Sequence, residues 1–272
     1  MRRELEIPRW PQPASVAVSL TFDVDAESGF LSEGAEYAAR LTTLSEAAFG
    51  PARGVGRILD LLSELALPAT FYVPGDTAER HTATVEQIVA AGHEVGHHGH
   101  LHLRSDRISA DQQREEIERG FAALQESVGV RPRGYRSPSW ELTPETFALL
   151  GEFGFDYDSS LMGDDRPYLE ERDDRTILEL PVHWSLDDWT HFWWGIDEGG
   201  RLATPSSVLE VWLAEFESAL ADRRHVTYTM HPEIIGRGHR IAMLRRFLET
   251  IRDRANIWFA SHGEICDYLR KP

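Results

Sequence analysis

Five histidines lie within the ten residues "HEVGHHGHLH", residues 93–102, and two pairs among them have metal-ligand spacing. His93 and His97 form an H-E-x-x-H pattern, which binds zinc in proteases when both histidines lie one turn apart on a helix. Glycine costs a helix interior about 1 kcal/mol, and residues 92, 96 and 99 are all glycine. The segment is therefore predicted to be a short strand that enters a glycine turn. This geometry favours the second pair, His98 and His102, as metal ligands; a solvated His-rich loop is the alternative, and a site would need a third ligand.

Two acidic residues that could complete such a site follow the apolar segment "SVAVSLTF", residues 15–22. Asp23 and Asp25 come directly after it, and residues two apart in an extended chain face the same side. Carboxylates that point into a buried space are costly unless they are paired or bind a metal. The ordinary alternative is an exposed Asp-rich turn, so the two residues alone do not define a site.

Further polar residues follow other strand-like segments. They are His231 after "VTYTM", Arg136 in "GYRSPSW", and Asp187, Asp188 and Trp189 at the end of "LELPVHWSLDDW". Each alone is compatible with a core histidine, a surface arginine or a solvated turn. Because catalytic residues of α/β barrels gather at the carboxyl ends of the strands, the set as a whole predicts one catalytic site.

Apolar strand-like runs alternate with amphipathic helical patterns along the chain, which predicts an α/β fold with a parallel sheet. We expect a distorted (β/α) barrel of about seven parallel strands, in a single domain that spans residues 1–272. Ser109, Thr143-Pro144 and Thr204-Pro205 have the pattern of helix starts. Residues 159–175, rich in Asp, Arg and Gly, are predicted to form one long loop that could rim and close the active site.

The formal net charge of −17 argues against nucleic acid as a partner, because phosphates would be repelled. Cys266 is the only cysteine, so an intrachain disulfide is excluded, and it is predicted to fill the core. The start "MRRELEIPRWPQP" lacks the apolar run of a secretory signal, and no long uncharged apolar run suits a membrane span. We expect a cytoplasmic enzyme that acts on a small-molecule or sugar amide; whether it forms a homo-oligomer is left open.

The ordered set of motifs resembles that of the polysaccharide deacetylase family, also called the NodB-homology or carbohydrate esterase 4 family. The resemblance runs from the first strand to the "TMHPE" segment. It rests on "TFDVD", "GHEVGHHGHLH", "RSPSW", "WSLDDW" and "TMHP".

The resemblance implies a role for each matching residue. Asp23 would be the catalytic base, Arg136 would hold that base, and His231 would be the general acid. The metal ligands would be Asp25, His98 and His102. One carboxylate and two imidazoles with open positions suit zinc, and iron, cobalt or nickel would also be accepted.

Two departures from the family pattern set limits on what it implies. Val24 separates two aspartates that are usually adjacent, and the shortened fourth motif leaves open whether Asp187 or Asp188 supports His231. Asp188 is the residue that we assign to this role. The motifs look like those of a cytoplasmic branch that includes peptidoglycan deacetylase-like, allantoinase-like and cyclic-imide-hydrolysing proteins, some of which are thought to work without a metal.

We therefore expect a metal-dependent hydrolase of a non-peptide amide bond, in an N-acetylated sugar or a related small amide. Trp140 and Trp189, with Trp193 and Trp194 beside them, are expected to wall the pocket for a sugar or a flat imide; core packing is the alternative. A hydrolase of a cyclic imide or ureide is the second candidate function. A catalytically inactive carbohydrate-binding barrel is a third candidate, but the chain keeps every proposed catalytic residue.

Overall fold

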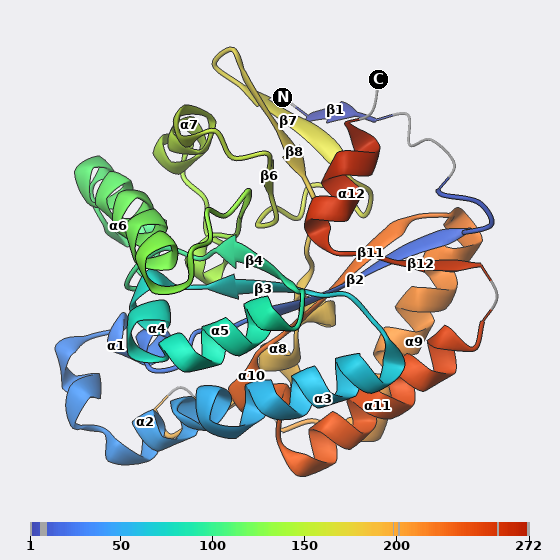
Figure 1. The fold of residues 1–272 in the computed structure, drawn as a ribbon, viewed down its shortest axis with the longest axis horizontal. Helices are drawn as coiled ribbons and strands as arrows, with labels where there is room; N and C mark the ends of the chain where they lie inside the picture. The colour runs from blue at the N-terminus through green and yellow to red at the C-terminus, as the bar shows by residue number, and fades with distance from the viewer. Residues whose placement is uncertain (1, 6–9, 198, 201, 255, 271–272) are drawn as a thin grey trace.

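A single ten-stranded sheet forms the centre of the computed structural model, which describes residues 2–5, 10–197, 199–200, 202–254 and 256–270 (Figure 1). Its middle is a run of seven parallel strands. In spatial order these are β8 (Arg175–Glu179), β6 (Tyr157–Asp158), β5 (Gly134–Tyr135), β4 (Glu94–His97), β3 (Thr70–Val73), β2 (Val16–Asp23) and β11 (His225–Met230). The predicted α/β fold with about seven parallel strands is confirmed.

The parallel run curls into a distorted half-barrel whose two ends approach each other. Beyond β8 the chain reaches Asp187, which forms an isolated parallel bridge with Thr229 in β11. β12 (Ile257–Phe259) pairs with the first half of β2, and β3 pairs with its last residues. The carboxyl ends of β2, β4, β5 and β11 consequently open on one common space.

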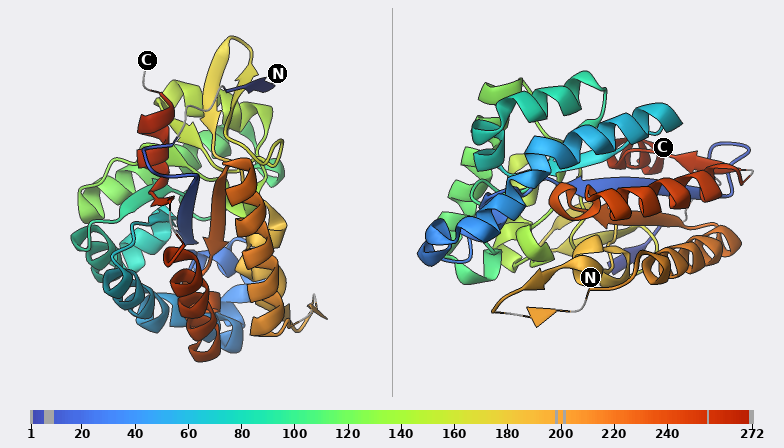
Figure 2. Two further views of the ribbon diagram at one scale, coloured as in Figure 1. Left: turned by 90° about the vertical axis from the view of Figure 1, so that its right-hand side faces the viewer. Right: turned by 90° about the horizontal axis from the view of Figure 1, so that it is seen from below.

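Helices pack around the outside of the curled sheet (Figure 2). The longer ones are α3 (Val55–Leu65), α5 (Thr82–Ala90), α6 (Ala110–Val128), α7 (Pro144–Phe153), α9 (Pro205–Asp222), α11 (Gly238–Arg252) and α12 (His262–Leu269). The short ones are α1 (Ser28–Leu31), α2 (Leu41–Ala47), α4 (Gly75–Arg80), α8 (Asp188–Phe192) and α10 (Pro232–Ile235). Within the described part of the chain, no helix has both the length and the apolar character to cross a bilayer.

The predicted helix starts are confirmed. Ser109 begins α6 with a capping box. Its hydroxyl oxygen accepts the backbone N–H of Gln112, and the side-chain oxygen of Gln112 accepts the backbone N–H of Ser109. Thr143 and Thr204 each accept a backbone N–H three residues ahead, and a proline occupies the first turn of each helix.

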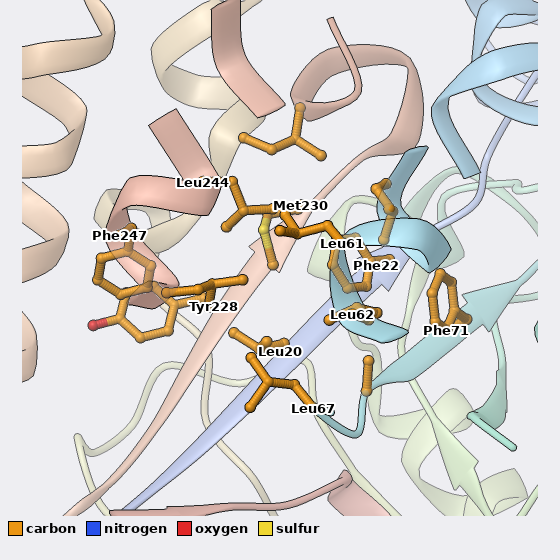
Figure 3. Close-up of a cluster of buried hydrophobic side chains, with 14 of the residues drawn as sticks. Leu20, Phe22, Leu61, Leu62, Leu67, Phe71, Tyr228, Met230, Leu244 and Phe247 are labelled. Carbon is orange, nitrogen blue, oxygen red and sulfur yellow. The ribbon is translucent and has the colours of Figure 1, made fainter. Parts of the chain in front are cut away.

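Alternation along β2 separates the hydrophobic core from the polar interior of the barrel. Leu20 and Phe22 point outward and pack with side chains of β3, β11, α3 and α11, as Figure 3 shows. Ser19, Thr21 and Asp23 point the other way and are equally buried. Burying a Leu or Phe side chain contributes about 1.5–3 kcal/mol, so this outer layer fixes the register of β2 and hence the direction of Asp23. Cys266 is buried in the core, as predicted.

The prediction of one long loop at residues 159–175 is wrong. It contains β7 (Tyr168–Arg172), which pairs antiparallel with β8 and with β1 (Arg2–Glu4). Asp173 and Asp174 have φ angles of 46° and 64°, the conformation of a two-residue hairpin turn. Of the N-terminal segment predicted to lack a secretory signal, residues 1 and 6–9 lie outside the described residues. The single domain over residues 1–272 stays a prediction.

Candidate active site

The residues predicted to be functional converge at the carboxyl ends of the parallel strands. A cavity of about 790 Å³ lies there. It is lined by most of the predicted residues, namely Asp23, Asp25, His98, His102, Trp140, Trp189 and His231. Arg136 and Asp188 lie behind this surface, where both are fully buried.

Three residues form a compact set of ligand atoms of the kind that binds a divalent metal. Asp25 Oδ1 lies 3.4 Å from His98 Nε2, and Asp25 Oδ2 lies 3.4 Å from His102 Nε2. The ligand atoms of all three lie within 4.8 Å of one another. Asp25 Oδ1 is buried and has no hydrogen-bond partner among the described residues, which is costly for a carboxylate. The set therefore fits a divalent ion.

The backbone orients one of these ligands. His98 Nδ1 lies 2.7 Å from the carbonyl oxygen of Arg136, to which it donates, so the lone pair is on Nε2 and faces Asp25. Burial, more than any neighbouring charge, lowers the pKa of His98 and brings that of His102 to about 4. Both imidazoles are therefore neutral at neutral pH, as metal ligation requires.

Glu116 in α6 holds the turn that carries the two histidines. One of its carboxylate oxygens accepts the backbone N–H groups of His100 and Leu101, both at 2.9 Å. Within this turn His102 has a φ of 59°, a left-handed conformation that a non-glycine residue adopts only when its surroundings enforce it. Sequence reasoning missed Glu116, because it lies in an acidic run of α6 with no distinguishing neighbour.

Asp23 is paired with a buried arginine. Arg136 Nη1 donates to Asp23 Oδ1 at 2.7 Å, and the other carboxylate oxygen lies 4.0 Å from His98 Nε2. Burial alone would raise the pKa of Asp23, but the charge of Arg136, with a smaller contribution from the imidazolium of His231, holds it below its usual value. Asp23 is therefore an ionised carboxylate that can accept a proton.

His231 is supported by Asp188. The Nδ1 of His231 donates to Asp188 Oδ1 at 2.8 Å, whereas Asp187 lies 3.6 Å away and accepts the backbone N–H of Trp189 to begin α8. Burial would lower the pKa of His231, but Asp187 and Asp188 together raise it well above its ordinary value. Asp187, Asp188 and His231 also have metal-ligand spacing. Since a proton already joins Asp188 to Nδ1, this group is better described as a supported imidazolium.

The H-E-x-x-H pair does not form a site. The segment is β4, as predicted, and not a helix. His97 is fully buried and packs against Phe121 and Phe155, with Nε2 3.0 Å from a backbone carbonyl oxygen of α6. His93 is half-buried beside Phe71, outside the cavity. The alternation of the strand therefore turns His98 inward and leaves His93 and His97, the two histidines of the protease pattern, on the outer side.

Aromatic rings wall the cavity in stacked pairs. Trp140 stacks on Trp184 with ring centroids 4.3 Å apart, and Trp189 stacks on Trp193 at 4.6 Å. Trp189 also meets the ring of His231 edge-on. The predicted tryptophans thus line the cavity, including Trp193 and Trp194. Residues 159–175 do not line it; the rim comes instead from the segment 29–46, which sequence reasoning did not assign to the site.

Comparisons with known proteins agree with this geometry. The family model for polysaccharide deacetylases matches residues 48–157. A crystal structure from Mycobacterium smegmatis, assigned by name to the polysaccharide deacetylases, is 40% identical with a TM-score of 0.94, and the match covers 98% of this chain and 94% of that one. The chain belongs to the polysaccharide deacetylase family.

Two other known proteins are more distantly similar. The peptidoglycan deacetylase of Helicobacter pylori is 27% identical over 285 residues, which span 94% of this chain and 97% of that protein. The allantoinase Puue superposes with a TM-score of 0.84 at 24% identity, over 98% of this chain and 96% of that one, and shows a shared fold. Deacetylases of this family hydrolyse carbon–nitrogen amide bonds, so the chain is identified as a hydrolase of such bonds. Those deacetylases depend on a metal, and this chain has a candidate group of metal ligands.

Proposed function

We propose that this polysaccharide deacetylase-like protein is a metal-dependent hydrolase that removes an acetyl group from an N-acetylated sugar or a related small amide. One observation carries the proposal. A metal-ligand set with an unpaired carboxylate oxygen lies between an ionised carboxylate, Asp23, and a supported imidazolium, His231. This is the arrangement that amide hydrolysis requires, with a base on one side of the reacting carbonyl and an acid on the other.

The metal would be held by Asp25, His98 and His102. A divalent ion there would supply Lewis-acid chemistry for the hydrolysis. The ligand set of one carboxylate and two imidazoles favours zinc, and it also accepts iron, cobalt or nickel.

The proton transfers belong to the chain. Asp23 accepts the proton of the attacking water through the oxygen that Arg136 does not occupy. His231 turns Nε2 toward the metal site, 3.8 Å from Asp25 Oδ2, and from there it donates a proton to the leaving nitrogen. Asp188 holds the opposite ring nitrogen, so it keeps the imidazole protonated and oriented.

A cyclic imide or ureide is the second substrate class that the cavity favours. The two stacked tryptophan pairs offer flat apolar faces in the cavity, one of them beside His231, and flat rings stack well on such faces. A cavity of about 790 Å³ has the size of a small-molecule site. We therefore propose better hydrolysis of small amides or imides than of polymeric chitin or peptidoglycan. A cytoplasmic location and a homo-oligomer stay predictions.

A substrate screen tests this function. The zinc-loaded protein is assayed on N-acetylglucosamine, chitin, peptidoglycan, hydantoin and succinimide, and kcat/KM is compared across the panel. Asp23→Asn and His231→Ala should each lower turnover by about 10²–10⁴ while the metal remains bound. Full activity in either variant would contradict the acid–base assignment, and a clear preference for the polymers would contradict the proposed small substrate.

A further inference from the structure

Glu233 is a buried acidic residue of the cavity that the proposed mechanism does not use. It lies in α10, two residues after His231, and its side chain lines the cavity. Only 1% of the residue is exposed. Both of its carboxyl oxygens are buried, and neither has a hydrogen-bond partner among the described residues.

The chain shows what a structural buried glutamate looks like here, and Glu233 differs from it. Glu116 accepts backbone N–H groups of the histidine turn, and Glu179 accepts those of Ser160 and Leu161. In both residues, hydrogen bonds to the protein offset the free-energy cost of burying the carboxyl group. Neither oxygen of Glu233 accepts a hydrogen bond from another described residue, so its burial costs stability.

The backbone packs closely against the carboxyl group of Glu233 on one side, and Glu233 is among the residues that line the cavity. A π-helical turn, Gly50–Gly54, lies against α10. A Cβ atom on Gly50 would lie 2.8 Å from Glu233 Oε2, and one on Gly54 would collide with the carbonyl oxygen of Pro232. Glycine at both positions thus lets the backbone cover the rear of the carboxyl group. π-Helical turns of this kind are common at functional sites.

We propose that Glu233 is a substrate-recognition residue whose carboxyl group pairs with an N–H or O–H donor of the substrate. The inference rests on the proposed hydrolase function and deepens it, since it requires the substrate to carry a polar donor in addition to the bond that is cleaved. The donor is a hydroxyl group if the substrate is a sugar, and a ring N–H if it is an imide or ureide. Burial, followed by the charge of Asp25, raises the pKa of Glu233 well above its ordinary value, as is common in functional clefts.

The kinetic test uses substrates that differ by one donor. The wild type and Glu233→Leu are compared on hydantoin and its N-methyl analogue, and on N-acetylglucosamine and its single-deoxy analogues. For the class that the wild type hydrolyses, loss of the recognised donor should raise KM about 10-fold or more in the wild type and leave it unchanged in Glu233→Leu. Equal losses in both proteins would overturn the proposal.

A stability test separates this proposal from the failure of the hydrolase assignment. Glu233→Leu should keep its metal content and unfold at a temperature higher by about 2–4 °C, because it removes an unpaired buried polar group. Glu249→Leu makes the same change on the exposed face of α11 and should leave the unfolding temperature nearly unchanged. A fall in the unfolding temperature of Glu233→Leu would show a structural role and overturn the proposal. If the wild type hydrolyses no member of the panel, the hydrolase assignment fails, and binding of the same paired compounds decides the role of Glu233.

Discussion

Arg136 is the residue whose replacement should most clearly expose the electrostatics of the site. Its guanidinium is fully buried and donates to Asp23 Oδ1 at 2.7 Å, to Thr21 Oγ1 at 2.9 Å, and to the carbonyl and hydroxyl oxygens of Ser159 at 3.0 and 2.9 Å. It also lies 4.2 Å from the ring centroid of Tyr72. Arg136→Met keeps the apolar stem and removes all of these bonds and the charge.

The expected cost follows from what the substitution leaves behind. Asp23 is 1% exposed, and after Arg136→Met the imidazole of His98, 4.0 Å away, would be neutral and could not replace the lost charge. Removing one partner of a buried ion pair typically costs about 3–5 kcal/mol in the free energy of unfolding. Asp23→Asn combined with Arg136→Met leaves no unpaired charge. The double variant should therefore lose about 1–3 kcal/mol less than the sum of the two single variants.

Urea unfolding followed by tryptophan fluorescence measures these free energies, since the chain has eight tryptophans. Chelator is present throughout, so that metal binding to the native state does not add to the stability. If the loss of stability in the double variant equals the sum of the losses in the two single variants to within about 0.5 kcal/mol, Asp23 and Arg136 do not stabilise each other. That result would refute the electrostatic account.

Three further predictions concern residues around this pair. Glu116→Ala should weaken zinc binding about 10–100-fold, because the turn that carries the metal ligands loses the acceptor of its backbone N–H groups. Glu115→Ala, on the exposed side of the same helix, should leave zinc affinity unchanged, and equal affinities of the two variants would contradict the positioning role of Glu116. His98→Ala should remove bound metal, measured by mass spectrometry, and His93→Ala should retain it; the reverse result would restore the protease-type site. Asp158 is buried beside Glu179, and burial raises its pKa from 3.8 to about 6, so the native state retains a proton that the unfolded state loses. The wild type should therefore lose up to about 3 kcal/mol of stability as the pH rises from about 4 to about 6, and Asp158→Asn should flatten this decline in urea titrations.

Much of the fold and of the site could be predicted because short-range rules apply to them. The alternation of a strand decides that Asp23 and Asp25 face one side, and the glycines around His97 decide that its segment is not a helix. Barrel topology then brings the ends of separate strands together. These rules, with the family motifs, were sufficient to name Asp23, Asp25, His98, His102 and His231, which the structure gathers in one cavity.

The remaining features depend on contacts that no local pattern encodes. Glu116 and Glu115 are adjacent acidic residues of one helix, and only the packing of α6 against the histidine turn distinguishes them. Glu233 has no distinguishing neighbour in the sequence, and only the fold shows that it is buried without a hydrogen-bond partner and packed against Gly50, far away in the chain. The segment 168–172 was missed because its charged residues suit a loop, although pairing with β1 and β8 makes it a strand.

The central claim is that Asp25, His98 and His102 hold a metal on which hydrolysis depends. The most direct measurement is the rate of amide hydrolysis by the wild type after chelation and dialysis, followed by titration with Zn²⁺. We predict that the metal-free protein loses nearly all activity, and that the rate returns in proportion to added zinc and levels off at one ion per chain. A metal-free protein that hydrolyses its substrate at the full rate would contradict the claim.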